Sequence, residues 1–373
     1  MIPFASPKRG YLRHKGEILA AIEKTLDSGN YILGPEVESF EEEFSRYCDV
    51  PYAIGVASGT DAIELGLRAL GVGQNDAVFS ASHTAVATIA AIERAGATPI
   101  FVDIDPESRC ISPDSLDEAV KRARQTSLVP KCVITVHLYG QPCEMDRLKL
   151  IATENDMFLF EDCAQAHGAL YNGRRVGSMG DIGAFSFYPT KNLGCFGDGG
   201  GIVTKDKNLS DQLTQLRQYG WDHKRDSQIS GVNSRLDEIQ AAILRVKLCY
   251  LDQDNQQRRA LAARYLEQLS ETPCKLPKSQ PNTEHVYHLF VIETDKRDQL
   301  SDFLKEREVM AAIHYPLPVH MQTIYQKKYK PMVSLYQTEQ LAKNILSLPM
   351  FPELGIQQVD MICESIRAWC QRQ

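Results

Sequence analysis

Short apolar runs alternate with stretches of helical spacing over about the first 200 residues, and this alternation constrains the fold more than any other feature. The runs begin with YAIGVAS at residue 52 and end with GGIVTK at residue 200. Helix-like stretches such as TDAIELGLRAL and TAVATIAAIERAG lie between the earlier runs. Strands that alternate with helices of this length predict an α/β fold with a mostly parallel sheet covered on both faces. Only a loop joins the last two runs, IGAFSFY and GGIVTK, so we expect that end of the sheet to depart from parallel order.

The pattern changes near residue 235, where two long helices are expected in place of the alternation. The helical segments outside the alternating region are 15–28, 37–48, two within 234–269, one around 297–308 and one that begins at 356. A strand-like run, VYHLFVIET, lies among the later ones. We therefore predict a large domain over residues 1–250, which includes the N-terminal segment, and a smaller α/β domain over residues 251–373.

Charge and hydropathy exclude several classes of protein. Lys and Arg number 41 and Asp and Glu 48, a net charge of −7, and the basic clusters are short, so we expect no nucleic-acid partner. No apolar stretch is long enough to cross a bilayer, and the first residues lack the apolar core of a signal peptide, so we expect no membrane partner. The ten cysteines form no Cys-x-x-Cys pair and the histidines show no ligand spacing. This predicts free thiols, no metal site and a cytoplasmic protein.

The segment Ala57-Ser-Gly-Thr-Asp61 follows an expected strand and opens an expected helix. Small residues let backbone N–H groups approach an anion, and a helix N-terminus favours negative charge. A plain strand-to-helix turn capped by Ser58 or Thr60 explains the same residues. The segment lacks both the dinucleotide glycine pattern and a Walker lysine.

The segment Glu161-Asp-Cys-Ala-Gln-Ala-His167 lies at the carboxyl end of an apolar run. In an open α/β sheet this edge is where ligands bind. A carboxylate here is suited to hold a protonated ring nitrogen, and Gln165 is suited to reach a ring hydroxyl. The alternative is a helix cap with polar neighbours.

Lys191 follows an apolar run and precedes a glycine-rich loop in the segment SFYPTKNLGCFGDGGG. Most lysines are solvated surface charges. A lysine shielded by aromatic residues, or close to another cation, titrates low enough to attack a carbonyl. Lys191 is therefore a candidate nucleophile.

Taken together, these segments resemble a known family. EDCAQAHGA, GDIGAFSFYPTKNLG followed by GDGG, and GVNSRLDEIQAAIL are similar to motifs of the DegT/DnrJ/EryC1/StrS sugar aminotransferases. The similarity runs from YILGPEVESFE to about residue 250, and IHYPLPVH is a later match. The resemblance implies pyridoxal 5′-phosphate (PLP), the fold-type-I architecture with a mixed, mostly parallel seven-stranded sheet and a smaller C-terminal α/β domain, and a homodimer with shared active sites.

The resemblance also assigns roles to residues that contact the cofactor. Lys191 resembles the catalytic lysine that holds PLP as a Schiff base, and Asp162 the catalytic carboxylate paired with the pyridine nitrogen. Gln165 resembles the group near the ring hydroxyl. The residues that resemble the phosphate cup are Gly59, Thr60 and Ser186.

Further positions follow from the same resemblance. Asn233 resembles the asparagine that the neighbouring subunit lends to the phosphate. His83 stands where the family places a ring that stacks on the cofactor, although many relatives have a larger aromatic residue there. Tyr188, His314 and Tyr315 match positions that line the sugar pocket in some relatives.

The implied reaction moves an amino group from L-glutamate to a nucleotide-linked keto-sugar. The GDGG after Lys191, the Tyr188-Pro189 step and ASHTAVAT resemble members that aminate carbon 3 of a dTDP-3-keto-6-deoxyhexose, and many 4-aminating relatives carry Glu where Asp198 stands. The alternatives are amination at carbon 4, a UDP-linked keto-sugar, or a non-catalytic regulator that only binds PLP or a sugar nucleotide.

Overall fold

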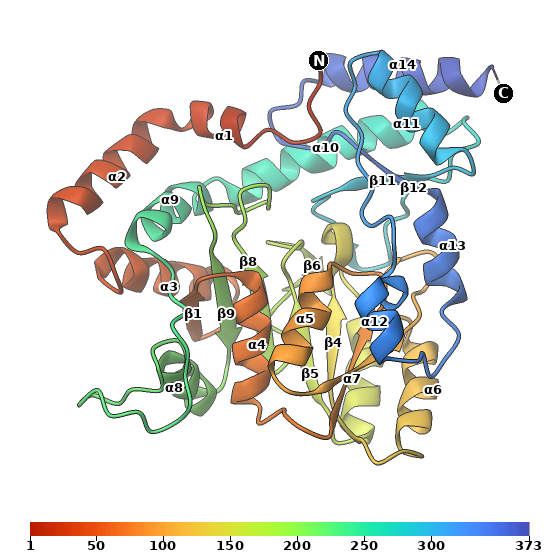
Figure 1. The fold of residues 1–373 in the computed structure, drawn as a ribbon. Coiled ribbons are helices and arrows are strands. Elements are labelled where there is room, and N and C mark those ends of the chain that lie inside the picture. The colour runs from red at the N-terminus through yellow and green to blue at the C-terminus, as the bar shows by residue number, and fades with distance from the viewer. Residues whose placement is uncertain (373) are drawn as a thin grey trace.

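The computed structural model describes residues 1–372, and a seven-stranded sheet lies at its centre (Figure 1). Its strands, in chain order, are β1 (Tyr52–Val56), β2 (Asp76–Ala81), β3 (Thr98–Val102), β4 (Val129–Val136), β5 (Phe158–Asp162), β8 (Ile182–Ser186) and β9 (Gly200–Thr204). The order across the sheet is β1-β9-β8-β5-β4-β2-β3. Neighbouring strands run parallel from β3 to β8, whereas β9 is antiparallel to both β8 and β1. The expected departure from parallel order is therefore confirmed, and it falls at the end of the sheet where it was expected.

Helices cover the sheet, and α4 and α5 lie in front of it in Figure 1. The helices up to the end of the sheet are α1 (Pro7–Arg13), α2 (Lys15–Ser28), α3 (Pro35–Tyr47), α4 (Gly59–Ala69), α5 (Val86–Arg94), α6 (Pro113–Ala123), α7 (Met145–Glu154), α8 (Lys207–Leu216) and the short η1 (Leu138–Gly140). Caps fix several starts: the hydroxyl of Ser112 accepts from Ser115 N at 3.3 Å before α6, and Asp206 accepts from two amides of α8. These caps place each helix close after its strand.

The later part of the chain adds helices and strands outside the seven-stranded sheet. Its elements are α9 (Glu238–Leu248), α10 (Leu251–Leu269), β11 (Phe290–Glu293), α11 (Arg297–Glu306), η2 (Val319–Met321), α12 (Thr323–Lys328), α13 (Tyr336–Asn344), β12 (Ile345–Leu348) and α14 (Ile356–Cys370). β11 and β12 pair antiparallel. A small separate sheet consists of β6 (Leu170–Tyr171), β7 (Arg174–Arg175) and β10 (Thr283–Glu284).

Buried apolar side chains form two clusters, a large one around the seven-stranded sheet and a smaller one among α10, α11, α14 and the β11–β12 pair. Ile2 belongs to the smaller cluster and its backbone bridges to Val309, so the N-terminus lies beside α14 (Figure 1). The domain boundary at residue 250 stays a prediction. All ten cysteines are free thiols, and no helix within residues 1–372 has the length and hydropathy that a membrane span requires.

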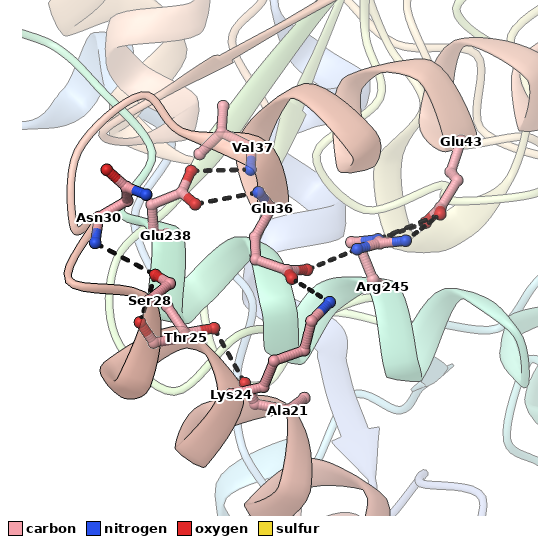
Figure 2. Close-up of polar contacts among 10 residues, drawn as sticks. All are labelled: Ala21, Lys24, Thr25, Ser28, Asn30, Glu36, Val37, Glu43, Glu238 and Arg245. Atoms are coloured by element: carbon pink, nitrogen blue, oxygen red, sulfur yellow. Dashed lines mark hydrogen bonds and ion pairs between the residues drawn. The ribbon is translucent and has the colours of Figure 1, made fainter.

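One carboxylate fixes the start of α3 to the start of α9. Glu238 is fully buried and accepts hydrogen bonds from the backbone N–H groups of Gly34, Glu36 and Val37 at 2.8–2.9 Å. Figure 2 shows Glu238 facing the first amides of α3. Helix N-termini leave four such donors without partners, so this distant side chain does the work of a cap.

Candidate active site

A cavity of about 340 Å³ lies at the carboxyl edge of the parallel strands, beside Lys191. It brings together the three segments that the sequence singled out and the later match around residue 314. The predicted residues that line it are Gly59, Thr60, Asp162, Gln165, Ser186, Tyr188, Lys191, His314 and Tyr315. The topology explains the meeting, because β5 and β8 are neighbours and both end at this edge.

One end of the cavity is suited to an anion. Ser58 caps α4 and accepts from Asp61 N at 3.1 Å, so the first amides of α4 remain available at Gly59 and Thr60. A Cβ on Gly59 would lie only 2.6 Å from Cβ of Ser186, so glycine is needed for this turn to touch the end of β8. The Ser186 hydroxyl thus lies beside the helix N-terminus, as the phosphate-cup prediction requires.

Two adjacent carboxylates on β5 have opposite environments. Burial acts to raise the pKa of Glu161, but His137 Nε2 at 3.1 Å and the amides of Gly177, Met179 and Gly180 at 2.7–2.8 Å hold it below the ordinary value. Glu161 is therefore saturated with donors and acts as a structural anion. It lies close to His137 and Cys163, but His137 already uses both ring nitrogens, since its Nδ1 accepts from Cys143 N.

Asp162 faces the cavity and has fewer donors. Its Oδ1 accepts from Ala164 N at 3.1 Å and its Oδ2 from the Thr88 hydroxyl at 2.9 Å. Burial dominates and raises its pKa, although these bonds and the charge of Lys191 oppose the rise. A buried carboxylate in this condition gains stability from a further cationic partner.

Lys191 supplies an amine that is easily deprotonated. It follows β8, and its removal from water lowers its pKa to about 8, while the negative charge of Asp162 opposes the shift. A substantial fraction of the amine is therefore uncharged at mildly alkaline pH, which a nucleophile toward a carbonyl requires.

The opposite wall is held by Gln165 and Tyr315. Gln165 Oε1 accepts from Tyr139 N at 2.8 Å, and its Nε2 donates to the Tyr315 hydroxyl at 3.1 Å. His314 Nδ1 lies 3.0 Å from the Ser347 hydroxyl. Burial and the charge of Lys191 lower the pKa of His314 to about 4, so this ring is neutral at physiological pH. The wall thus presents neutral polar groups to a ligand.

Two predicted residues do not line the cavity. His83 is buried and its Nε2 lies 2.6 Å from the Tyr139 hydroxyl, which itself donates to the carbonyl of His314. The ring therefore supports the wall from behind, and the small Ala85 lines the cavity, so the stacking of His83 on the cofactor stays a prediction. Asn233 is exposed on the surface of the chain, and its predicted role in a partner's site stays a prediction.

The sequence reasoning missed residues that share the cavity, notably Thr84, Thr88 and His288. The segment ASHTAVAT was noted for its resemblance to the family, and its TAVAT part as the start of a helix-like stretch, but neither threonine was assigned to the site. The spacing of four between its two threonines at the start of a helix was the available signal, because residues four apart lie on one helix face.

Comparisons with known proteins agree with this geometry. The model of the DegT/DnrJ/EryC1/StrS aminotransferase family matches residues 13–367. This chain belongs to that family. It is 44% identical over 372 residues to the dTDP-3-amino-3,4,6-trideoxy-alpha-D-glucose transaminase of Streptomyces venezuelae. The matched region covers 100% of this chain and 97% of that protein.

A second relative and a solved structure are also closely similar to this chain. The dTDP-3-amino-3,6-dideoxy-alpha-D-galactopyranose transaminase of Aneurinibacillus thermoaerophilus is 44% identical over 99% of both chains. The crystal structure of S. venezuelae DesV in complex with a ketimine intermediate superposes with a TM-score of 0.95 at 43% identity, covering 100% of this chain and 99% of that one. The predicted fold, the aminotransferase class and the PLP cofactor are thereby confirmed at the level of the family.

Proposed function

We propose that this protein transfers an amino group from L-glutamate to carbon 3 of a dTDP-linked 3-keto-6-deoxyhexose, using PLP. The observation that carries the chemistry is the pairing, in one cavity, of an easily deprotonated lysine and a buried carboxylate that accepts hydrogen bonds from only two donors within residues 1–372. The substrate class is supported by the two relatives at 44% identity, whose names specify 3-amino dTDP-sugars.

The residues present fit PLP. Asp162 would hold the protonated pyridine nitrogen, Lys191 would anchor the aldehyde carbon, and the α4 N-terminus with Ser186 would hold the phosphate. When bound, PLP supplies an electron-withdrawing ring that stabilises negative charge on a neighbouring carbon. Gln165 would lie beside the ring hydroxyl.

The chain's own residues move the proton and exclude water. Lys191 Nζ accepts a proton from the α-carbon of the amino donor and returns one to the former carbonyl carbon of the sugar. Tyr188, 53% exposed, lies at the mouth where the nucleotide-linked substrate would enter. His314 and Tyr315, held by hydrogen bonds from behind, orient the sugar.

We also propose a homodimer in which Asn233 completes the partner's phosphate site, since its side chain is exposed in the single chain. The free state of all ten cysteines supports a reducing compartment, the cytoplasm.

Reduction of the holoenzyme with borohydride, followed by peptide mapping, tests the anchor. We expect the label on Lys191, and Lys191→Ala should lose transamination by several orders of magnitude. A label on another residue, or none, would contradict the proposal.

Mixed dimers of Lys191→Ala and Asn233→Ala test the shared site. At most one working site per dimer should return. If no activity returns in the mixed dimers, the cross-subunit role of Asn233 is excluded.

A panel of dTDP- and UDP-linked keto-sugars, incubated with PLP and glutamate and read by mass spectrometry and NMR, tests the substrate. Product with the 3-keto dTDP-sugar supports the proposal. Preference for a 4-keto or UDP-linked sugar replaces the substrate, and a spectral change with glutamate but no product from any sugar favours a regulator.

A further inference from the structure

Thr88 is the only side chain that donates a hydrogen bond to Asp162 within the described residues 1–372. It lies in the first turn of α5, is 1% exposed, and its hydroxyl is 2.9 Å from Asp162 Oδ2. A threonine hydroxyl in a helix can bond the carbonyl one turn earlier. Here the hydroxyl leaves the helix and bonds the carboxylate instead.

A second threonine lies behind the first. Thr84 is 3% exposed, and its hydroxyl is 3.0 Å from that of Thr88. A hydroxyl carries a single proton. Because an ionised Asp162 only accepts, Thr88 gives its proton to Asp162 and accepts the proton of Thr84. The hydrogen bonds thus run in one direction, from Thr84 through Thr88 to the carboxylate.

We propose that Thr88, supported by Thr84, is a positioning residue that holds Asp162 ionised with its remaining lone pairs facing the cofactor's ring nitrogen. The inference rests on the proposed function, because the ring nitrogen belongs to PLP. Glu161 gives the contrast: four donors fix that carboxylate completely, whereas Asp162 has two and keeps capacity for a cation.

The expected consequence concerns proton sharing. A hydrogen bond to the ionised form lowers a carboxyl pKa, so its loss raises that of Asp162. Asp162 then stays neutral to higher pH, and a neutral carboxyl does not favour a protonated ring nitrogen. The acidic limb of the pH profile should therefore move upward, while the covalent link at Lys191 is retained.

Three variants of the holoenzyme test this: Thr88→Val, which keeps the shape but loses the hydroxyl, Thr88→Ser, which keeps the hydroxyl, and Thr84→Val. We expect Thr88→Val to retain borohydride-trapped PLP on Lys191, to lose about 10- to 100-fold in kcat at neutral pH with little change in KM, and to shift the acidic limb of kcat/KM and of the cofactor absorbance titration upward by about one pH unit. Thr88→Ser should restore both, and Thr84→Val should show a smaller shift.

The inference would be overturned if Thr88→Val had the same pH titration and the same kcat as the wild-type protein. So would an equal defect in Thr88→Ser with an unshifted titration, because packing alone would then explain the loss. Failure of the wild-type protein to carry PLP on Lys191 would instead overturn the proposed function. If Thr88→Val does not fold, the absorbance titration of Thr84→Val decides. An upward shift supports the role of the hydrogen bonds that run from Thr84 through Thr88 to Asp162, and an unchanged curve contradicts it.

Discussion

At the scale of single residues, the site depends on how many donors each buried charge receives. Asp162 and Lys191 line one cavity, and burial acts against the charge of both. Each therefore retains reactivity that a saturated ion pair would lose. Coulomb attraction between them is present but smaller than the burial effect on each group.

The lowered pKa of Lys191 predicts a pH-dependent stability of the apoprotein. Its pKa is about 8 when folded and about 10.4 in an unfolded chain. Below pH 8 both states are charged and folding bears the full cost of the buried charge; between these two values the unfolded chain binds more protons, so stability rises with pH. Lys191→Met should thus stabilise the apoprotein by about 1–3 kcal/mol at pH 7, and this gain should shrink above pH 8.

Urea unfolding of both apoproteins from pH 6 to pH 10 measures the difference. Lys247, whose pKa burial also lowers to about 8, is present in both proteins and cancels. A difference in unfolding free energy that does not change with pH would contradict the lowered pKa of Lys191.

Most residues of the candidate site could be predicted from the sequence, because they follow strands that end at one edge of the sheet. Gly59, Asp162 and Lys191 were predicted from such positions or from resemblance to family motifs, and all three line the cavity. Local sequence does not show which side chain of a loop turns inward, and His83 does not line the cavity, so its stacking on the cofactor stays a prediction. Thr88 was missed because its role depends on a hydrogen bond to Asp162 of β5, a contact between residues 74 positions apart.

At the scale of elements, helices with clear apolar spacing were predicted closely. The segment 15–28 coincides with α2, and the helix expected from 356 with α14. The segment GVNSRLDEIQAAIL was predicted to be helical from residue 234 and also matched a family motif, but the capping role of Glu238 was not foreseen. A helix cap supplied by a residue about 200 positions away leaves no local signal in the sequence of either helix.

Glu238→Ala should therefore destabilise the protein strongly. Three buried or half-buried amides of the α3 start would lose their acceptor, at a cost of about 2–4 kcal/mol in total. Asp237→Ala is the matched control. It removes one negative charge from the same turn, but the Asp237 side chain is exposed and makes no capping hydrogen bond. Chemical denaturation measures both, and equal losses would show that charge rather than hydrogen bonding holds the α3 start.

Ion pairs next to this cap also join α2, α3 and α9. Arg245 of α9 reaches Glu36 and Glu43 of α3, and Lys24 of α2 donates to Glu36 at 2.9 Å (Figure 2). Burial opposes it, but these two cations lower the pKa of Glu36. Two N-terminal helices, α2 and α3, are thus tied to α9, the helix that follows the Asn233 segment.

At the scale of the whole molecule, the first residues cross to the far end of the chain. Ile2 exchanges backbone hydrogen bonds with residues 308 and 310 at 2.6 and 3.0 Å. The Phe4 ring stacks on the His314 ring with 5.2 Å between centroids. The N-terminal segment, residues 1–6, therefore supports the wall of the cavity through a long-range contact that the division of the sequence at residue 250 did not reveal.

Phe4→Ala should accordingly loosen the sugar side of the site while leaving the PLP side intact. His314 would lose the ring that covers one of its faces, so we expect KM for the keto-sugar to rise several-fold. The borohydride label should stay on Lys191, and kcat should change less than KM, since Asp162 and Lys191 are held by β5 and β8. Ile2→Ala is the control, because it removes a buried side chain of the same N-terminal segment that packs in the smaller cluster. It should lower thermal stability without raising KM. If both variants raise KM equally, then the N-terminal segment acts only through overall stability, and the contact between Phe4 and His314 has no specific part in holding the substrate.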